Sequence, residues 1–98
     1  MAGLYAVVRT RGSAWDDNLA MEEQADWDAH AAFMDTLYEH GSILLAGPLG
    51  GSGDILLVMR IFEPEDAPAV LANDPWTRNG LLTITRVAPW TLRLGSFD

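Results

Sequence analysis

A long amphipathic segment that leads directly into a strand is the feature that most constrains the fold of this chain. Residues 27–49 read WDAHAAFMDTLYEHGSILLAGPL. At about 100° per residue, the apolar side chains fall on one stripe of a helix. They are Trp27, Ala31, Met34 and Tyr38, with Phe33 and Leu37 beside them. Glycine commonly follows the last helical turn. We therefore expect a helix that ends at Gly41 and a strand over residues 42–49.

The beginning of this helix is expected near Leu19. Asn18 is a suitable N-cap residue, because its side chain can accept hydrogen bonds from the first free N–H groups of a helix. Glu22 and Glu23 would then lie in the early turns, where the helix dipole favours negative charge.

Three further segments have the composition of β-strands. They are residues 4–10 (LYAVVRT), 55–62 (ILLVMRIF) and 81–94 (LLTITRVAPWTLRL), the last interrupted around Pro89. The glycine-rich residues 50–54 predict a hairpin that joins strand 42–49 to strand 55–62. Residues 12–18 are expected to form a polar loop, in which we interpret Trp15 as a packing anchor.

Residues 63–73 (EPEDAPAVLAN) predict a second, shorter helix. Its two prolines must lie in or near the first turn, where a missing N–H has little effect. The helix should stop at Asp74, because a residue that precedes proline is disfavoured in the helical region. Residues 76–80 are expected to form a turn before the last strand.

The resulting order is βαββαβ, the ferredoxin-like arrangement of the α+β class, with an antiparallel sheet and two helices on one face. A chain of 98 residues predicts a single domain, 1–98. Strands 4–10 and 55–62 are apolar on both faces, so the face without helices needs a cover. We expect a homodimer through this open sheet face. The alternative is a monomer with scattered exposed apolar side chains.

The net charge of the chain limits the kinds of partner that it can bind. Fourteen acidic residues stand against six basic ones, all arginine, and the formal net charge is −8. Such a chain repels phosphate backbones and anionic lipid surfaces, so we expect neither nucleic acid nor a membrane as partner. The absence of cysteine excludes disulfides and thiol nucleophiles. No segment has the pattern of a signal peptide or a bilayer span, which predicts a cytoplasmic location.

His30 lies on the apolar side of the first helix, and two interpretations stay open. It could be a core histidine held by a backbone carbonyl or by Asp26, or it could be a general acid/base. A base needs an orienting carboxylate. Asp74 is the candidate, because both helices of this fold lie on the same face of the sheet. The alternative for Asp74 is ordinary Asp-Pro turn chemistry.

Metal and cofactor sites are not expected. His30 and His40 are ten residues apart, which is about 15 Å along a helix and too far to share an ion. The glycines match no phosphate-binding loop, and no GxSxG motif occurs.

A small-molecule pocket is expected between the helix layer and the sheet, lined by Trp27, Met34 and Trp76. Arg60 and Arg78 are candidates for binding a substrate carboxylate. Ion pairs with the many acidic residues are the alternative use of both arginines.

Four segments together resemble the YciI-like, or YCII-related, domain family. They are Tyr5-Ala6-Val7-Val8, His30-x-x-Phe33-Met34 running on to Gly41, Ala46-Gly47-Pro48-Leu49, and Asn73-Asp74-Pro75-Trp76 followed by Gly80-Leu81. The resemblance implies a dimeric α+β barrel. It also implies an active site at His30 and Asp74, onto which the characteristic histidine and aspartate of the family map. The family includes a dehydrochlorinase-like activity on a chlorinated hydroxyquinol, and relatives in the wider superfamily resemble muconolactone isomerase.

Two departures from the family pattern prevent a substrate from being carried over: Trp76 stands where the family commonly has Phe, and residues 12–18 look locally elaborated. The leading hypothesis is a small cofactor-independent enzyme. In it, a His30–Asp74 pair transfers a proton in an elimination, an isomerisation or a lactone-type step on a small metabolite, with cyclic and aromatic compounds as candidates. The alternative is a non-catalytic ligand-binding or accessory dimer.

Overall fold

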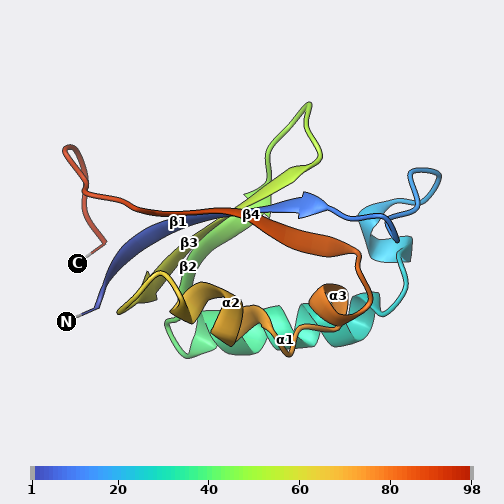
Figure 1. Ribbon diagram of the computed structural model, residues 1–98, viewed down its shortest axis with the longest axis horizontal. Coiled ribbons are helices and arrows are strands. Elements are labelled where there is room, and N and C mark those ends of the chain that lie inside the picture. The colour runs from blue at the N-terminus through green and yellow to red at the C-terminus, as the bar shows by residue number, and fades with distance from the viewer. Residues whose placement is uncertain (1, 98) are drawn as a thin grey trace.

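Four strands pair into one antiparallel sheet in the computed structural model, which describes residues 2–97. The strands are β1 (Gly3–Arg11), β2 (Ile43–Pro48), β3 (Asp54–Ile61) and β4 (Leu82–Pro89). Their order across the sheet is β2-β3-β1-β4, so the first and third strands of the chain lie in the centre. Figure 1 shows the strong twist of this sheet and the helices gathered below it. The α+β, ferredoxin-like fold class predicted from the sequence is confirmed.

The register places one charged residue of β1 on the helix-covered face. β1 pairs with β3 from Gly3 opposite Ile61 to Thr10 opposite Asp54. Its pairing with β4 shifts register between Val8 and Arg9. Because side chains alternate between faces, Arg9 shares a face with Val7, which is fully buried.

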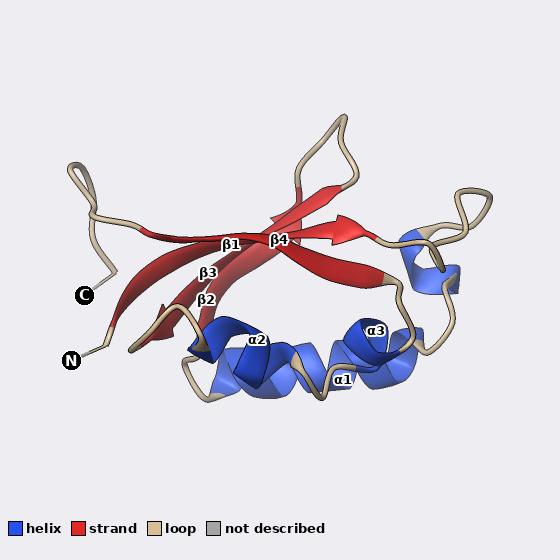
Figure 2. Cartoon of the chain, viewed as in Figure 1, coloured by secondary structure: helices blue, strands red, loops and turns tan. Residues whose placement is uncertain are grey.

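The helices all cover the same face of the sheet, as Figure 2 shows. They are α1 (Trp27–Glu39), α2 (Asp66–Leu71) and α3 (Pro75–Arg78), and a short 3₁₀ helix, η1 (Met21–Glu23), precedes them. The main core lies between this layer and the sheet and joins Val7, Leu57 and Met59 to Leu71 of α2. No helix in the described part of the chain is both long enough and apolar enough to cross a membrane.

The first helix ends as predicted but begins later. Gly41 has a φ of 81°, and the Ser42 N–H donates to the Leu37 carbonyl at 3.0 Å, which is the glycine-terminated end expected. The predicted start near Leu19 and the Asn18 N-cap are wrong. Asp26 has a left-handed φ of 61° and is the N-cap residue of α1, so the backbone breaks between η1 and α1.

The second helical region differs from the prediction in a similar way. The predicted helix over residues 63–73 is restricted to α2, and α3 occupies the first part of the predicted turn 76–80. The two are separated at Asp74, whose extended backbone (ψ 126°) reflects the proline that follows. The last strand ends at Pro89 rather than continuing to residue 94. These changes place Asp74 at the start of a new helix.

Candidate active site

A buried histidine and a buried aspartate from different helices meet in the helix layer. His30 projects from the first turns of α1, and Asp74 is the N-cap residue of α3. The His30 Nδ1 lies 2.8 Å from Asp74 Oδ1 and 3.0 Å from Oδ2. The break at Asp74 leaves the first N–H groups of α3 free, so the carboxylate that contacts His30 can also accept a hydrogen bond from the Trp76 N–H.

Asp74 is fully buried and fully hydrogen-bonded. Its Oδ1 accepts a hydrogen bond from the Trp76 backbone N–H at 3.0 Å, as expected of an N-cap residue. Its Oδ2 accepts one from Arg9 Nη1 at 2.8 Å. Burial alone would raise the pKa of Asp74, but the hydrogen bonds from His30, from Trp76 and from Arg9 outweigh burial and leave that pKa below its usual value. Asp74 is therefore a carboxylate at neutral pH.

Arg9 is the residue of this site that the sequence analysis did not single out. Its side chain is 1% exposed, and its Nη2 donates to Thr77 Oγ1 at 2.7 Å in addition to the Asp74 contact. The guanidinium therefore connects β1 to both ends of the first turn of α3. The signal was present in the sequence, because Arg9 follows Tyr5 and Val7 at alternate positions on the apolar face of its strand.

The ring of Trp76 supports the imidazole of His30 by stacking against it. The rings of His30 and Trp76 are stacked, with centroids 3.8 Å apart and planes within 5°. The fully buried Trp76 is itself fixed by a 2.7 Å hydrogen bond from Nε1 to the Ala25 carbonyl. Trp15 packs edge-on against it at 5.5 Å, in agreement with the predicted anchoring role of Trp15. The imidazole is thus held by a ring stack on one side and by a carboxylate at Nδ1.

A cavity of about 230 Å³ opens beside the imidazole, between α1 and the strands β2 and β3. Its wall is mostly apolar and consists of Arg9, Met21, Trp27, His30, Met34, Ala46, Gly47, Pro48, Ile55, Leu57 and Leu82. Within residues 2–97, Arg9 Nε is the one buried side-chain nitrogen or oxygen without a hydrogen-bond partner. No hydrogen bond from His30 Nε2 is found within residues 2–97, and Nε2 is not among the buried atoms without a partner, so it retains accessible surface in a residue that lines this cavity.

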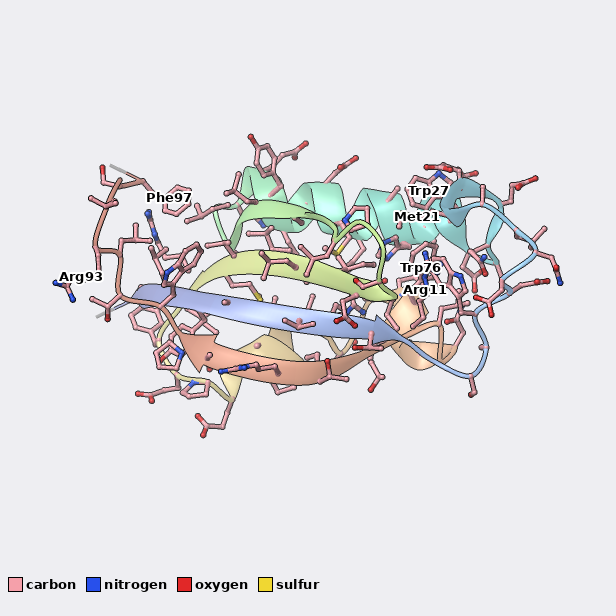
Figure 3. All side chains as sticks on the ribbon, turned by 90° about the horizontal axis from the view of Figure 1, so that it is seen from above. Arg11, Met21, Trp27, Trp76, Arg93 and Phe97 are labelled. Carbon is pink, nitrogen blue, oxygen red and sulfur yellow. The ribbon has the colours of Figure 1, made fainter. Side chains whose placement is uncertain are left out.

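The structure brings some of the predicted site residues together and leaves others apart. Trp27 and Met34 line the cavity. Trp76 does not, because it lies behind His30 with no exposed surface. Arg60 lies on the opposite face of the sheet, in a hollow with Gly3 and Phe97. Figure 3 shows Met21, Trp27 and Trp76 at one end of the molecule and Phe97 at the other.

Arg78 is also outside the cavity wall. Its Nη2 donates a hydrogen bond to Asn73 Oδ1 at 2.7 Å. No group of three His, Asp or Glu side chains within residues 2–97 is arranged to hold a metal ion.

The geometry fixes the chemistry that His30 can perform. With Asp74 ionised, Nδ1 keeps its proton and its N–H donates a hydrogen bond to the carboxylate, so in the neutral ring Nε2 has a free lone pair. A positioned imidazole with an orienting acid is the arrangement of a general base. The pair can accept a proton from a molecule in the cavity, and Asp74 stabilises the imidazolium that results.

Comparison with known proteins adds one positive finding. A model of the YCII-related domain matches residues 4–91, which includes the four strands apart from Gly3 and all residues of the cavity wall. A search among curated proteins finds no match.

Proposed function

The chain belongs to the family of YCII-related domains, and on this premise we propose that it is a small cofactor-independent enzyme that transfers a proton through His30 and Asp74. The observation that carries the proposal is the 2.8 Å contact between His30 Nδ1 and a buried, ionised Asp74, with Nε2 free at a cavity. A core histidine needs only one partner for its donor nitrogen. A second ring nitrogen open to a hollow is what proton transfer requires.

The step balances without a further reactant. Nε2 takes a proton from a weakly acidic C–H or O–H group, and the electron pair of that bond moves into the substrate. In an elimination this pair forms a double bond and a leaving group departs with its own pair. In an isomerisation or a lactone-type step the imidazolium returns the proton at another atom. In the isomerisation, this return of the proton restores His30 to its original state. In the elimination, His30 returns to its original state when it gives the proton to water or to the leaving group.

Proton transfer can be detected before the full reaction is known. A panel of cyclic ketones, unsaturated lactones and hydroxyquinols is incubated with the protein in deuterated water and followed by proton NMR. We expect protein-dependent exchange or conversion of at least one compound, and a loss of about 10²–10⁴-fold in His30→Gln, the usual contribution of a positioned acid/base. Folding of the variant is checked by circular dichroism. An active compound that His30→Gln handles as fast as the wild type would refute the role of His30.

A homodimer through the open sheet face is part of the proposal. That face carries an apolar hollow lined by Ala6, Val8, Leu56 and Trp90, among others. Leu45 is 56% exposed and Trp90 42% exposed, and contiguous exposed apolar surface marks contact sites. A second copy of the chain would cover them, and light scattering on the eluting protein tests this assembly. The cytoplasmic location also remains a prediction.

A further inference from the structure

The cavity beside His30 has no free cation for a charged ligand. All six arginines lie within residues 2–97, the chain has no lysine, and Arg9 is the one arginine in the cavity wall. Its Nη1 donates to Asp74 and its Nη2 donates to Thr77. Its Nε is buried and has no hydrogen-bond partner, and the whole side chain is only 1% exposed. The guanidinium charge is therefore compensated by Asp74 and is not presented to the cavity.

The surroundings of the cavity are acidic. Glu22, Asp26 and Asp28 border a neighbouring hollow that shares Trp27 with the cavity. The whole chain has a formal charge of −8. An approaching anion therefore meets repulsion outside the cavity and an apolar wall inside it, where a carboxylate without a partner is costly to bury.

The size of the cavity bounds the ligand. A cavity of about 150 Å³ with apolar walls is known to hold benzene, and this one measures about 230 Å³. It therefore has room for one six-membered ring with a few small substituents. It has two flexible walls, Met21 and Met34, whose thioether side chains adapt to ring substituents.

We propose that the cavity selects an uncharged molecule of about one ring that carries a weakly acidic O–H or C–H, and that it excludes carboxylates of the same shape. This inference rests on the proposed function for the identity of the site and narrows its substrate class. In particular, it removes lactones that carry a free carboxylate group from the candidates.

Charge balance around His30 supports the same conclusion. When the imidazole is in the form that can accept a proton and the ligand is uncharged, the charges of Arg9 and Asp74 cancel and no net charge remains beside the cavity. After the proton moves to Nε2, the imidazolium and the new ligand anion are adjacent and cancel as well. A ligand that arrives as an anion would leave one uncompensated negative charge in a mostly apolar cavity, both before and after the transfer.

The test compares three probes of one ring: phenol, benzamide and benzoate. Benzamide and benzoate have the same shape, and at neutral pH only benzoate is charged. Dissociation constants are measured by chemical-shift titration of the wild type, Ala46→Phe and Ala32→Phe. Ala46 is exposed and in the cavity wall, so the larger ring blocks the cavity without disturbing the core. Ala32 is exposed on α1 and outside the cavity wall, so Ala32→Phe makes the same substitution away from the cavity and is the matched control.

We expect phenol and benzamide to bind at least about tenfold more tightly than benzoate. Ala46→Phe should abolish this binding, and Ala32→Phe should preserve it. Benzoate binding as tight as that of benzamide would overturn the proposal. So would binding that survives in Ala46→Phe, or no binding of either uncharged probe. Proton transfer that continues at the wild-type rate in His30→Gln would refute the proposed function and leave this selectivity intact.

Discussion

The two faces of the sheet reverse the usual distribution of charge and apolar surface. On the helix-covered face, Arg9 and Asp74 are buried with 1% and 0% exposure. On the uncovered face, Leu45 and Trp90 are exposed. Charged side chains are seldom buried unless they are paired, and exposed apolar clusters mark contact surfaces. Each face departs from the ordinary pattern where a function is proposed: proton transfer on one face and self-association on the other.

The largest expected effect comes from breaking the buried charge pair. Asp74→Asn keeps the size and the N-cap acceptor but leaves the Arg9 guanidinium buried without a counter-charge. Loss of one partner of such a pair lowers the free energy of unfolding by about 3–5 kcal/mol, which urea unfolding at fixed protein concentration measures. The control is Arg9→Met combined with Asp74→Asn, which should be more stable than Asp74→Asn alone. If the two substitutions are simply additive in their cost, the pair is not the reason for the burial of Arg9.

The uncovered face gives the next largest effect. Val8 lies in the apolar hollow of that face, so Val8→Asp would bury an unpaired carboxylate between two copies. The cost, about 2–4 kcal/mol, corresponds to a dimer dissociation constant raised about thirty-fold or more. Sedimentation equilibrium measures it. Ala32→Asp adds the same charge to the exposed side of α1 and should leave the assembly unchanged. A wild-type chain that sediments as a monomer would contradict the contrast between the two faces.

The comparison also shows how far the sequence predicts this molecule. The order of strands and helices along the chain and the end of α1 at Gly41 followed from local patterns. The ferredoxin-like topology put Asp74 on the same face as His30, but the spacing of the two residues did not by itself establish their contact. The late start of α1 did not, because it depends on a left-handed Asp26, a conformation that no pattern in residues 18–26 announces. The burial of Arg9 could not be predicted from its position, because charged residues near a strand end are usually exposed. Only its partners in α3, 65 residues later in the chain, make burial tolerable.

Replacing Trp76, whose ring stacks on His30, should have a smaller effect on stability than the two substitutions above. Trp76→Phe removes the hydrogen bond to the Ala25 carbonyl and part of the surface against which the imidazole stacks. We expect a loss of about 1–2 kcal/mol in the free energy of unfolding and a several-fold fall in proton-transfer rate. The comparison variant is Trp15→Phe, which keeps an aromatic ring at the edge contact and does not touch His30. Equal losses of rate in both variants would mean that the stack has no special role.

The smallest expected effect is a pH dependence of stability that comes from Asp74, on the helix-covered face. The pKa of Asp74 is lower in the folded protein than its ordinary value of about 3.9. As the pH falls, the unfolded chain therefore takes up this proton first. The stability that Asp74 contributes is complete above about pH 4 and is lost as the pH falls through the lower folded value.

One group changes the free energy of unfolding by at most about 1.4 kcal/mol per pH unit. The other acidic residues titrate in the same range, so the measurement is the difference between wild type and Asp74→Asn in thermal unfolding from neutral to acid pH. We expect that difference to be constant above about pH 4 and to shrink below it. Ala32→Asp serves as the reference for an added exposed carboxylate, which should give no such narrowing. A constant difference down to the acid limit would show that the Asp74 carboxylate is not held ionised by its buried partners, and the contrast between the two faces would then rest on packing alone.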